Sequence, residues 1–313
     1  MGPNHTLIRI VSGLFLAVRV FCSSHAGDGT RTMVAVRTPV PPVVDGFLTD
    51  TVWLHAISTG EFIQRDPEEG QPASEQTEVR VLYDDAALYF ACMFFDSQPD
   101  EIVGHLTRRD NEVESDHGSV RIDSYHDHQT AFEFTFNAAG VKVDILQYDD
   151  ANREDPSWDP VWGLQTQRTE NGWSAELRIP FSILRYKQPL GGAGEGEWGI
   201  NVIRHVSRKQ EDSYWVFTPK SESGFVSRFG HLTGLRNVPT PRQLEVLPFV
   251  VAKQEFEPER DDREERNEFS ANAGLDLRYN VARNFVLDAT FNPDFGQVEA
   301  DPAVLNLTTF ETF

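Results

Sequence analysis

Two tryptophans in a proline-broken segment are the aromatic side chains best placed for ligand chemistry. Trp158 and Trp162 lie within residues 155–162, where no alternation of apolar and polar residues would bury them. Exposed aromatic rings stack on the apolar C–H faces of sugars, while Asn, Gln, Asp and Arg side chains fix the hydroxyl groups. The two rings can therefore clamp a sugar. The alternative is that both rings cap the edge of a core.

Acidic loop residues are a second group with possible chemistry. Ca²⁺ takes six to eight oxygen ligands, so clustered loop carboxylates and carbonyl groups suit it. Asp149 and Asp150, followed by Asp155, form the best such cluster. They are the candidate ligands of a structural calcium ion, although no spacing reproduces an EF-hand loop and solvated surface acids are the alternative.

His126 and His128 are separated by one residue in the sequence. In extended chain the two side chains point the same way and can ligate a transition metal. The sequence offers no evident third ligand. A surface turn is the alternative interpretation.

No motif supports catalysis. The chain has no His-Glu-x-x-His, no Gly-x-Ser-x-Gly and no phosphate-binding glycine loop, and these are the patterns that hydrolases and nucleotide enzymes commonly carry. Two carboxylates in a cleft can hydrolyse a glycosidic bond, but no pair stands out among 49 Asp and Glu residues. If the protein is an enzyme, we expect a glycoside hydrolase.

The charge of the chain excludes one class of partner. The formal net charge is -21 and no basic stripe offsets it, so the surface repels phosphate backbones. We therefore expect no nucleic-acid partner.

The N-terminus predicts export. Arg9 provides a basic start, residues 10–21 form an apolar stretch, and Ser24-His25-Ala26 resembles a cleavage site. We interpret residues 1–26 as a signal peptide. Cys92 is then the only cysteine of the mature chain, so no internal disulfide is expected.

Short stretches of period-two alternation predict an all-β fold. One example is Phe132, Phe134 and Phe136 with polar residues between them, and another is Trp173 to Ile179. Turn residues separate the stretches, and no sustained helical periodicity occurs. This pattern predicts an antiparallel, jelly-roll-like β-sandwich over residues 39–238, with Trp53, Trp173 and Trp198 in its core.

After residue 241 the predicted strands become longer. They cover residues 244–256, 269–279 and 284–292. In the second of these, Phe269, Leu275 and Leu277 share one side, while polar residues such as Asp276 occupy the other. Strands of about ten residues with such alternation are typical of an outer-membrane barrel, and a soluble sheet shows the same pattern. Residues 242–313 are thus predicted to be the N-terminal fragment of a β-barrel.

Several motifs carry a family resemblance. Val44-Asp45-Gly46 leading to Trp53, residues 78–89, and Gly172-Trp173-Ser174-Ala175-Glu176 leading to Ile179-Pro180-Phe181 resemble family 9 carbohydrate-binding modules over most of residues 39–238. Residues 290–302, Thr-Phe-Asn-Pro-Asp-Phe-Gly-Gln-Val-Glu-Ala-Asp-Pro, look like the opening of an uncharacterised barrel domain that commonly follows such a module in bacterial outer-membrane proteins.

The resemblance implies further site residues. Arg109 and Arg204 fall in stretches similar to the barrel-linked version of the module, where polar side chains ring a pocket. A structural ion pair is the alternative for each. Family 9 modules also resemble a scaffold that carries calcium ions, in agreement with the acidic loop cluster.

Together these features predict carbohydrate binding by an exported, outer-membrane-associated protein. Its partners would be an oligosaccharide or polysaccharide, captured for uptake or breakdown, and the outer membrane through the barrel. The sandwich would lie in the periplasm or at the cell surface. The alternatives are a glycoside hydrolase component, and a structural or transport protein whose sandwich plugs or gates the barrel or carries haem.

Overall fold

The computed structural model describes residues 31–111, 113–186, 195–238, 244–257, 266–282 and 285–292, and in these ranges the chain is β-structure with short 3₁₀ turns. The predicted signal peptide and residues 293–302 of the second motif lie outside the described residues. No helix in the described ranges is long and apolar enough to cross a membrane.

The strands and 3₁₀ helices follow one another in this order: β1 (Thr32–Arg37), η1 (Thr51–His55), β2 (Ile63–Asp66), β3 (Thr77–Tyr83), β4 (Ala87–Phe95), η2 (Pro99–Glu101), β5 (His117–Asp123), β6 (Ala131–Asn137), β7 (Lys142–Tyr148), β8 (Arg153–Asp155), β9 (Gly163–Thr169), β10 (Gly172–Pro180), η3 (Phe181–Ile183), β11 (Glu195–Val206), η4 (Ser207–Lys209), β12 (Glu211–Tyr214), η5 (Val226–Arg228), β13 (Gly230–Arg236), β14 (Leu244–Glu257), β15 (Arg266–Ala282) and β16 (Phe285–Phe291).

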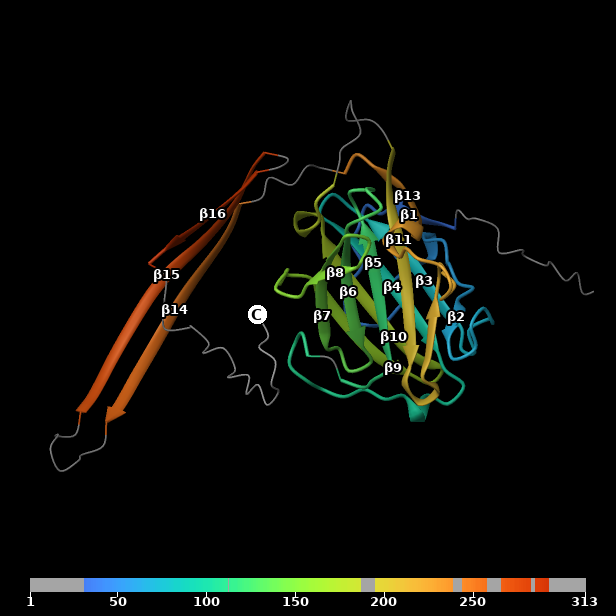
Figure 1. The fold of residues 1–313 in the computed structure, drawn as a ribbon, viewed down its shortest axis with the longest axis horizontal. Helices are drawn as coiled ribbons and strands as arrows, with labels where there is room; N and C mark the ends of the chain where they lie inside the picture. The colour runs from blue at the N-terminus through green and yellow to red at the C-terminus, as the bar shows by residue number, and fades with distance from the viewer. Residues whose placement is uncertain are drawn as a thin grey trace, which may run out of the picture.

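One curled sheet forms a two-layer sandwich (Figure 1). The first layer has the order β8-β7-β6-β5-β11-β13, with β12 pairing to β11 and to β2, and the second has the order β3-β4-β10-β9. Strand β1 joins the two layers because Thr32–Val34 pair with β13 and Ala35–Arg37 pair with β3. Both pairings are parallel, which differs from the fully antiparallel sandwich that the sequence predicts.

Aromatic side chains fill the space between the layers. Phe94 of β4 stacks on Trp173 of β10 at 4.1 Å between ring centroids, and both rings lie 6.1 Å from Phe136 of β6 in the other layer. Gly118 of β5 allows these three rings to approach one another, because a Cβ atom at this position would lie 2.5 Å from Cζ of Phe94. The alternating aromatic pattern therefore becomes the interdigitated core of a sandwich.

A second, smaller core covers the outer face of β3 and β4. Trp53 of η1 packs with Leu82, Tyr89 and Ala91. Its indole Nε1 donates to Oε1 of the buried Glu176 at 2.8 Å, and Oε2 of Glu176 accepts from the backbone N–H groups of Asp45 and Gly46 at 2.9 Å. The motifs that carry the family resemblance thus form one structural clamp.

Strands β14, β15 and β16 form a separate three-stranded antiparallel sheet. The register pairs Pro248 with Leu275 and Leu275 with Phe291, so alternate residues of all three strands share a face. That face carries exposed apolar side chains, among them Val250, Phe269 and Phe291. The opposite face carries polar residues such as Asp276 of β15, as the alternation predicts, together with the exposed Leu247 of β14.

The prediction of an all-β fold is confirmed, and so is the burial of Trp53, Trp173 and Trp198. The sandwich begins earlier than expected, at β1, which precedes the predicted boundary at residue 39.

Candidate functional site

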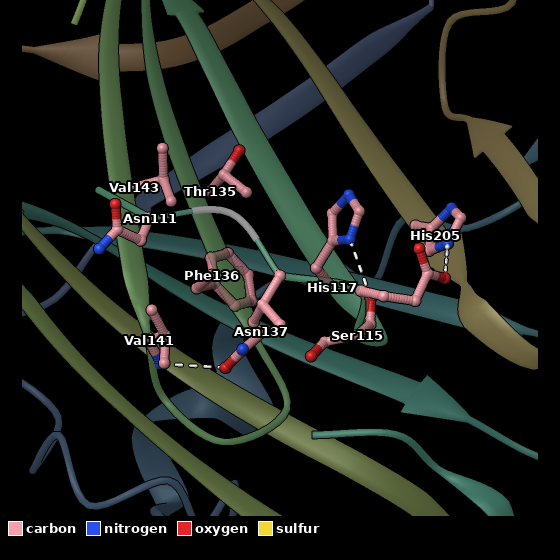
Figure 2. A pocket seen from close by; sticks show the side chains of 11 residues that line it. Asn111, Ser115, His117, Thr135, Phe136, Asn137, Val141, Val143 and His205 are labelled. Carbon is pink, nitrogen blue, oxygen red and sulfur yellow. Dashed lines mark hydrogen bonds and ion pairs between the residues drawn. The ribbon is translucent and has the colours of Figure 1, made fainter. Parts of the chain in front are cut away.

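The candidate site is a depression of about 290 Å³ on the outer face of the first layer (Figure 2). It lies over β5, β6, β7 and β11 and is bordered by the segment that precedes β5. The lining residues are Asn111, Val113, Glu114, Ser115, His117, Thr135, Phe136, Asn137, Val141, Val143 and His205.

Strand alternation and register place these side chains together. On β6, Phe134 and Phe136 are core residues, so Thr135 between them faces outward. His117 of β5 pairs with Asn137 of β6 on one side and with His205 of β11 on the other. One row across three strands therefore presents an amide and two imidazoles to the depression.

Some of the polar side chains that line the depression are hydrogen-bonded to backbone groups. Oδ1 of Asn137 accepts from the N–H groups of Ala139 and Val141 at 3.0 Å, and Nδ2 donates to the carbonyl of His105 at 2.9 Å. The hydroxyl of Ser115 accepts from the N–H of His105 at 3.0 Å. These bonds fix the walls of the depression.

Asn111 differs from these residues. Its side chain is exposed, and its side-chain amide makes no hydrogen bond to another described residue, while its backbone N–H donates to the carbonyl of Arg108. It therefore presents both donor and acceptor groups to a ligand, because a side-chain amide carries an NH₂ donor and a carbonyl acceptor.

His205 is held between two carboxylates. Its Nδ1 lies 2.8 Å from Oδ1 of Asp212, and its Nε2 lies 3.5 Å from Oε1 of Glu114. The hydrogen bond to Asp212 raises the pKa of His205 against the opposing effect of burial. Hydrogen bonds from Ser207 and Gln210 lower the pKa of Glu114. The imidazole is thus oriented and biased toward its charged form.

The two imidazoles stack on one another beside apolar side chains. The rings of His117 and His205 stack with centroids 4.8 Å apart and an interplanar angle of 17°. Val113, Val141 and Val143 supply the apolar part of the lining. An aromatic ring pair, short aliphatic walls and hydrogen-bonding groups suit a small polyhydroxylated molecule.

Three of the sequence-predicted residues meet elsewhere, around Asp144 of β7. Nε1 of Trp162 donates to Oδ1 of Asp144 at 3.0 Å, and Nη2 of Arg109 donates to the same oxygen at 2.7 Å. Trp158 packs on Phe132 and Phe134. Only 3% of Trp162 is exposed, which agrees with the alternative that this ring caps the edge of the core. Trp158 is half-buried, and its role in sugar binding stays a prediction.

Arg109 also makes a structural ion pair, which is the alternative to a ligand-binding role for this residue. Nη2 lies 2.7 Å from Oδ1 of Asp159 and donates to the carbonyl of Pro160 at 2.6 Å. The guanidinium therefore ties the loop of Trp158 and Trp162 to β7.

Arg204 is fully buried between the layers, and none of its partners is shared with Arg109. It donates to the carbonyls of Gln76 at 2.8 Å and Phe95 at 2.6 Å, and its guanidinium lies over the ring of Phe94. Burial lowers its pKa to about 10. A side chain that is this enclosed holds strand ends together and does not face the depression.

The acidic cluster does not fit a calcium ion in this arrangement. The carboxylate of Asp150 accepts from the N–H groups of Phe225 and Ser227 and from the Ser227 hydroxyl. Oδ1 of Asp155 accepts from the N–H and hydroxyl of Ser157. Asp149 is an exposed turn residue. Within the described ranges, no group of three or more His, Cys, Asp or Glu side chains could hold a metal ion in the rotamers shown.

The residues of the depression were missed by sequence reasoning. His117 and His205 lie 88 positions apart by their numbers, and only the strand order β6-β5-β11 makes them neighbours. The alternation around Thr135 places it on the outward face, but it does not show which outward residues border a hollow.

Comparisons with known proteins separate the two parts of the chain. A family described as a domain of unknown function, DUF5916, matches residues 240–313. A search of curated proteins found no match. The remaining similarities are to solved structures.

Two of these structures are carbohydrate-binding modules of family 9 from Caldicellulosiruptor kristjanssonii. The complex with cellotriose is 15% identical with a TM-score of 0.46 and covers 68% of this chain and 100% of the module. The complex with glucose is 16% identical with a TM-score of 0.47 and covers 67% of this chain and 100% of the module.

A third is a proposed carbohydrate-binding protein from Bacteroides uniformis. It is 10% identical with a TM-score of 0.51, and the match covers 65% of this chain and 98% of that one. At this identity the likeness concerns the fold, and the sandwich of residues 31–238 therefore shares the β-sandwich fold of that protein.

Proposed function

We propose that the protein binds a neutral carbohydrate in the depression between Asn111, His117, Thr135 and His205. The observation that supports this most is the lining itself, which combines a free amide, a stacked imidazole pair and valines in one hollow. The fold shared with a proposed carbohydrate-binding protein supports the same ligand class.

The size of the depression limits the ligand. At about 290 Å³ it is near the lower end of small-molecule sites, which span roughly 300 to 1,000 Å³. It suits one sugar ring or the end of an oligosaccharide. A longer polysaccharide would place one sugar unit at a time in the depression.

Glycan-array screening followed by isothermal titration tests this proposal. Asn111→Ala and His117→Ala should each weaken the affinity for the best glycan about tenfold or more, the loss expected for one good polar or stacking contact. Asn152→Ala removes an amide from the turn between β7 and β8, outside the lining, and should leave the affinity unchanged.

The same titration compares the depression with the loop that carries Trp158 and Trp162. If Trp158→Ala abolishes binding while Asn111→Ala does not, the sugar binds at the loop and the proposed site is wrong. Flat responses of the wild-type protein across plant and bacterial glycans would contradict carbohydrate binding altogether. Release of reducing sugar would instead indicate a glycoside hydrolase.

A second proposal concerns export and the membrane. We propose that the chain is exported and that strands β14 to β16 are the first strands of an outer-membrane barrel. The supporting observation is the apolar face of this sheet, on which Val250 is 75% and Phe269 is 68% exposed. Contiguous exposed apolar surface of this kind marks a face that contacts lipid or protein.

Cell fractionation and vesicle flotation test the membrane proposal. Val250→Glu or Phe269→Glu should shift the protein out of the outer-membrane fraction, because a charge on the lipid-facing side of a strand is strongly unfavourable. Thr290→Glu places the same charge on the polar face and should have little effect. Equal partition of all three variants would contradict the proposal.

A further inference from the structure

Three histidines and a glutamate gather at one end of the first layer, outside the depression. The ring of His126 lies 4.7 Å from that of His128 and 5.9 Å from that of His231, measured between centroids. Nδ1 of His231 lies 2.5 Å from Oε1 of Glu197. His231 supplies the third imidazole that the sequence pattern of His126 and His128 lacks.

The strand register brings these residues together from three parts of the chain. Gly199 of β11 pairs with Asp123 of β5 on one side and with His231 of β13 on the other. A Cβ atom on Gly199 would lie 3.0 Å from Cβ of Asp123. The glycine therefore keeps this end of the layer open beneath the β5–β6 loop that carries His126 and His128.

Asp123 shapes that loop. Its carboxylate accepts from the N–H of His128 at 2.9 Å and from the N–H of Asp127 at 3.3 Å, while its carbonyl accepts from the N–H of His126. His126 and His128 both have positive φ, at 49° and 60°, a conformation that non-glycine residues adopt at a cost. These contacts fix the loop from which the ring of His126 reaches that of His231.

The contact with Glu197 orients the ring of His231. A carboxylate beside Nδ1 selects the tautomer in which Nδ1 carries the proton and Nε2 offers a lone pair, which is the usual arrangement of a metal-binding histidine. Nδ1 is otherwise buried without a hydrogen-bond partner among the described residues. The pair thus leaves Nε2 as the coordinating nitrogen.

The ring spacing matches that of imidazoles that share one ion. With Zn–N bonds of about 2.0 Å and tetrahedral angles, ring centroids on one Zn²⁺ lie about 5 Å apart, which is between the two spacings observed. In the rotamers shown, these side chains do not form a group that could hold a metal ion. Rotation of the exposed His128 and half-buried His126 side chains is the adjustment required.

We propose that His126, His128 and His231 bind a divalent transition-metal ion such as Zn²⁺, with Glu197 positioning His231. Three imidazoles with one further position open to carboxylate or water form a donor set that Zn²⁺ accepts. The site is separate from the sugar proposal, because none of its residues lines the depression.

Titration of the full chain, without a histidine tag, with ZnCl₂ alone tests the site. We expect one Zn²⁺ bound per chain at micromolar concentration. His126→Ala and His231→Gln should each weaken the Zn²⁺ affinity at least tenfold, while His55→Ala, an exposed histidine of η1, should leave it unchanged. Co²⁺ in place of Zn²⁺ should give the intense visible absorption of a four-coordinate site.

Two results would overturn the proposal. One is a wild-type chain that binds no Zn²⁺ under these conditions. The other is undiminished binding by the triple variant His126→Ala, His128→Ala and His231→Gln, which would place the ion elsewhere. If His231→Gln fails to fold by circular dichroism, His128→Ala carries the test, because that side chain is exposed in a loop.

Discussion

Glu176 joins two of the motifs that carry the family resemblance through hydrogen bonds within the protein. It is fully buried on β10 and accepts hydrogen bonds from Trp53, Asp45 and Gly46. Burial is the largest influence on its pKa and raises it, although these donors oppose the effect. The Asp-Gly to Trp motif and the Trp-Ser-Ala-Glu motif are thus two halves of one clamp.

Removing this carboxylate should destabilise the sandwich. Glu176→Ala leaves three donors without an acceptor, two of them buried, so the free energy of unfolding should fall by about 3 kcal/mol or more. Glu176→Gln keeps one acceptor oxygen and should cost less. Urea unfolding measures both, and Glu78→Gln on the partly exposed side of β3 is the control. Equal stability of Glu176→Ala and wild type would contradict the clamp.

His205 gives a prediction about pH. Its pKa in the folded state is raised by Asp212, so the pair stabilises the fold below the unfolded value of about 6.5, and the stabilisation is lost as the pH rises through the folded-state value. Asp212→Asn should therefore lower the free energy of unfolding by about 0.5 kcal/mol near pH 5.5 and by less near pH 9, a small effect because solvent screens the pair.

Urea unfolding at the two pH values checks this sign, with Asp100→Asn on the exposed surface as the control. An Asp212→Asn effect that grows with pH would show that the carboxylate does not favour the charged imidazole.

The sequence identifies individual core residues better than site residues. Trp53, Trp173 and Trp198 follow turns or alternate with apolar neighbours, and all three are buried. Trp162 has no such pattern, and its burial depends on the distant acceptor Asp144. Arg204 is buried because two carbonyl groups at strand ends accept its hydrogen bonds. Such long-range partners are not visible in local spacing.

At the scale of elements, β5 illustrates how the layers fit. Gly118 faces the core, where Cζ of Phe94 and Cζ of Phe136 would lie 2.5 and 3.0 Å from a Cβ atom. Gly118→Ala should therefore destabilise the protein by about 2 kcal/mol through overpacking. Gly196→Ala on β11 meets only ordinary contacts of 3.6 Å or more and should change stability by less than about 0.5 kcal/mol.

Thermal and urea unfolding of these two variants provide the measurement. If Gly118→Ala proves as stable as Gly196→Ala, the two layers pack less closely at β5 than the structure shows.

Element prediction succeeded where alternation was strong and failed where it was weak. The patterns around Phe132 and Trp173 predicted β6 and β10. Strand β5, His-Gly-Ser-Val-Arg-Ile-Asp, mixes core and polar residues with a glycine, and its position between β6 and β11 comes from tertiary pairing. The parallel pairing of β1 with two strands is likewise a property of the assembled sheet.

At the scale of the whole molecule, the core clusters of the described residues lie within the sandwich. Their members fall between Met33 and Val238, and among the described strands β14 to β16 pair only with one another. A chain of residues 31–238 should therefore fold alone, with the same urea midpoint as this sandwich has in the full chain. A chain that starts after β1, at residue 38, should be much less stable, because β1 joins the two layers.

Circular dichroism during urea unfolding compares these chains. An unfolded 31–238 chain would show that the sandwich needs the residues that follow it.

The most direct test of carbohydrate binding is an NMR titration of the 31–238 chain, once it is shown to fold, with the best glycan from the array. The account predicts saturable shifts of backbone signals at Asn111, Ser115, His117, Thr135 and His205, which surround the depression. The absence of shifts at saturating glycan, or shifts confined to the loop of Trp158, would contradict it.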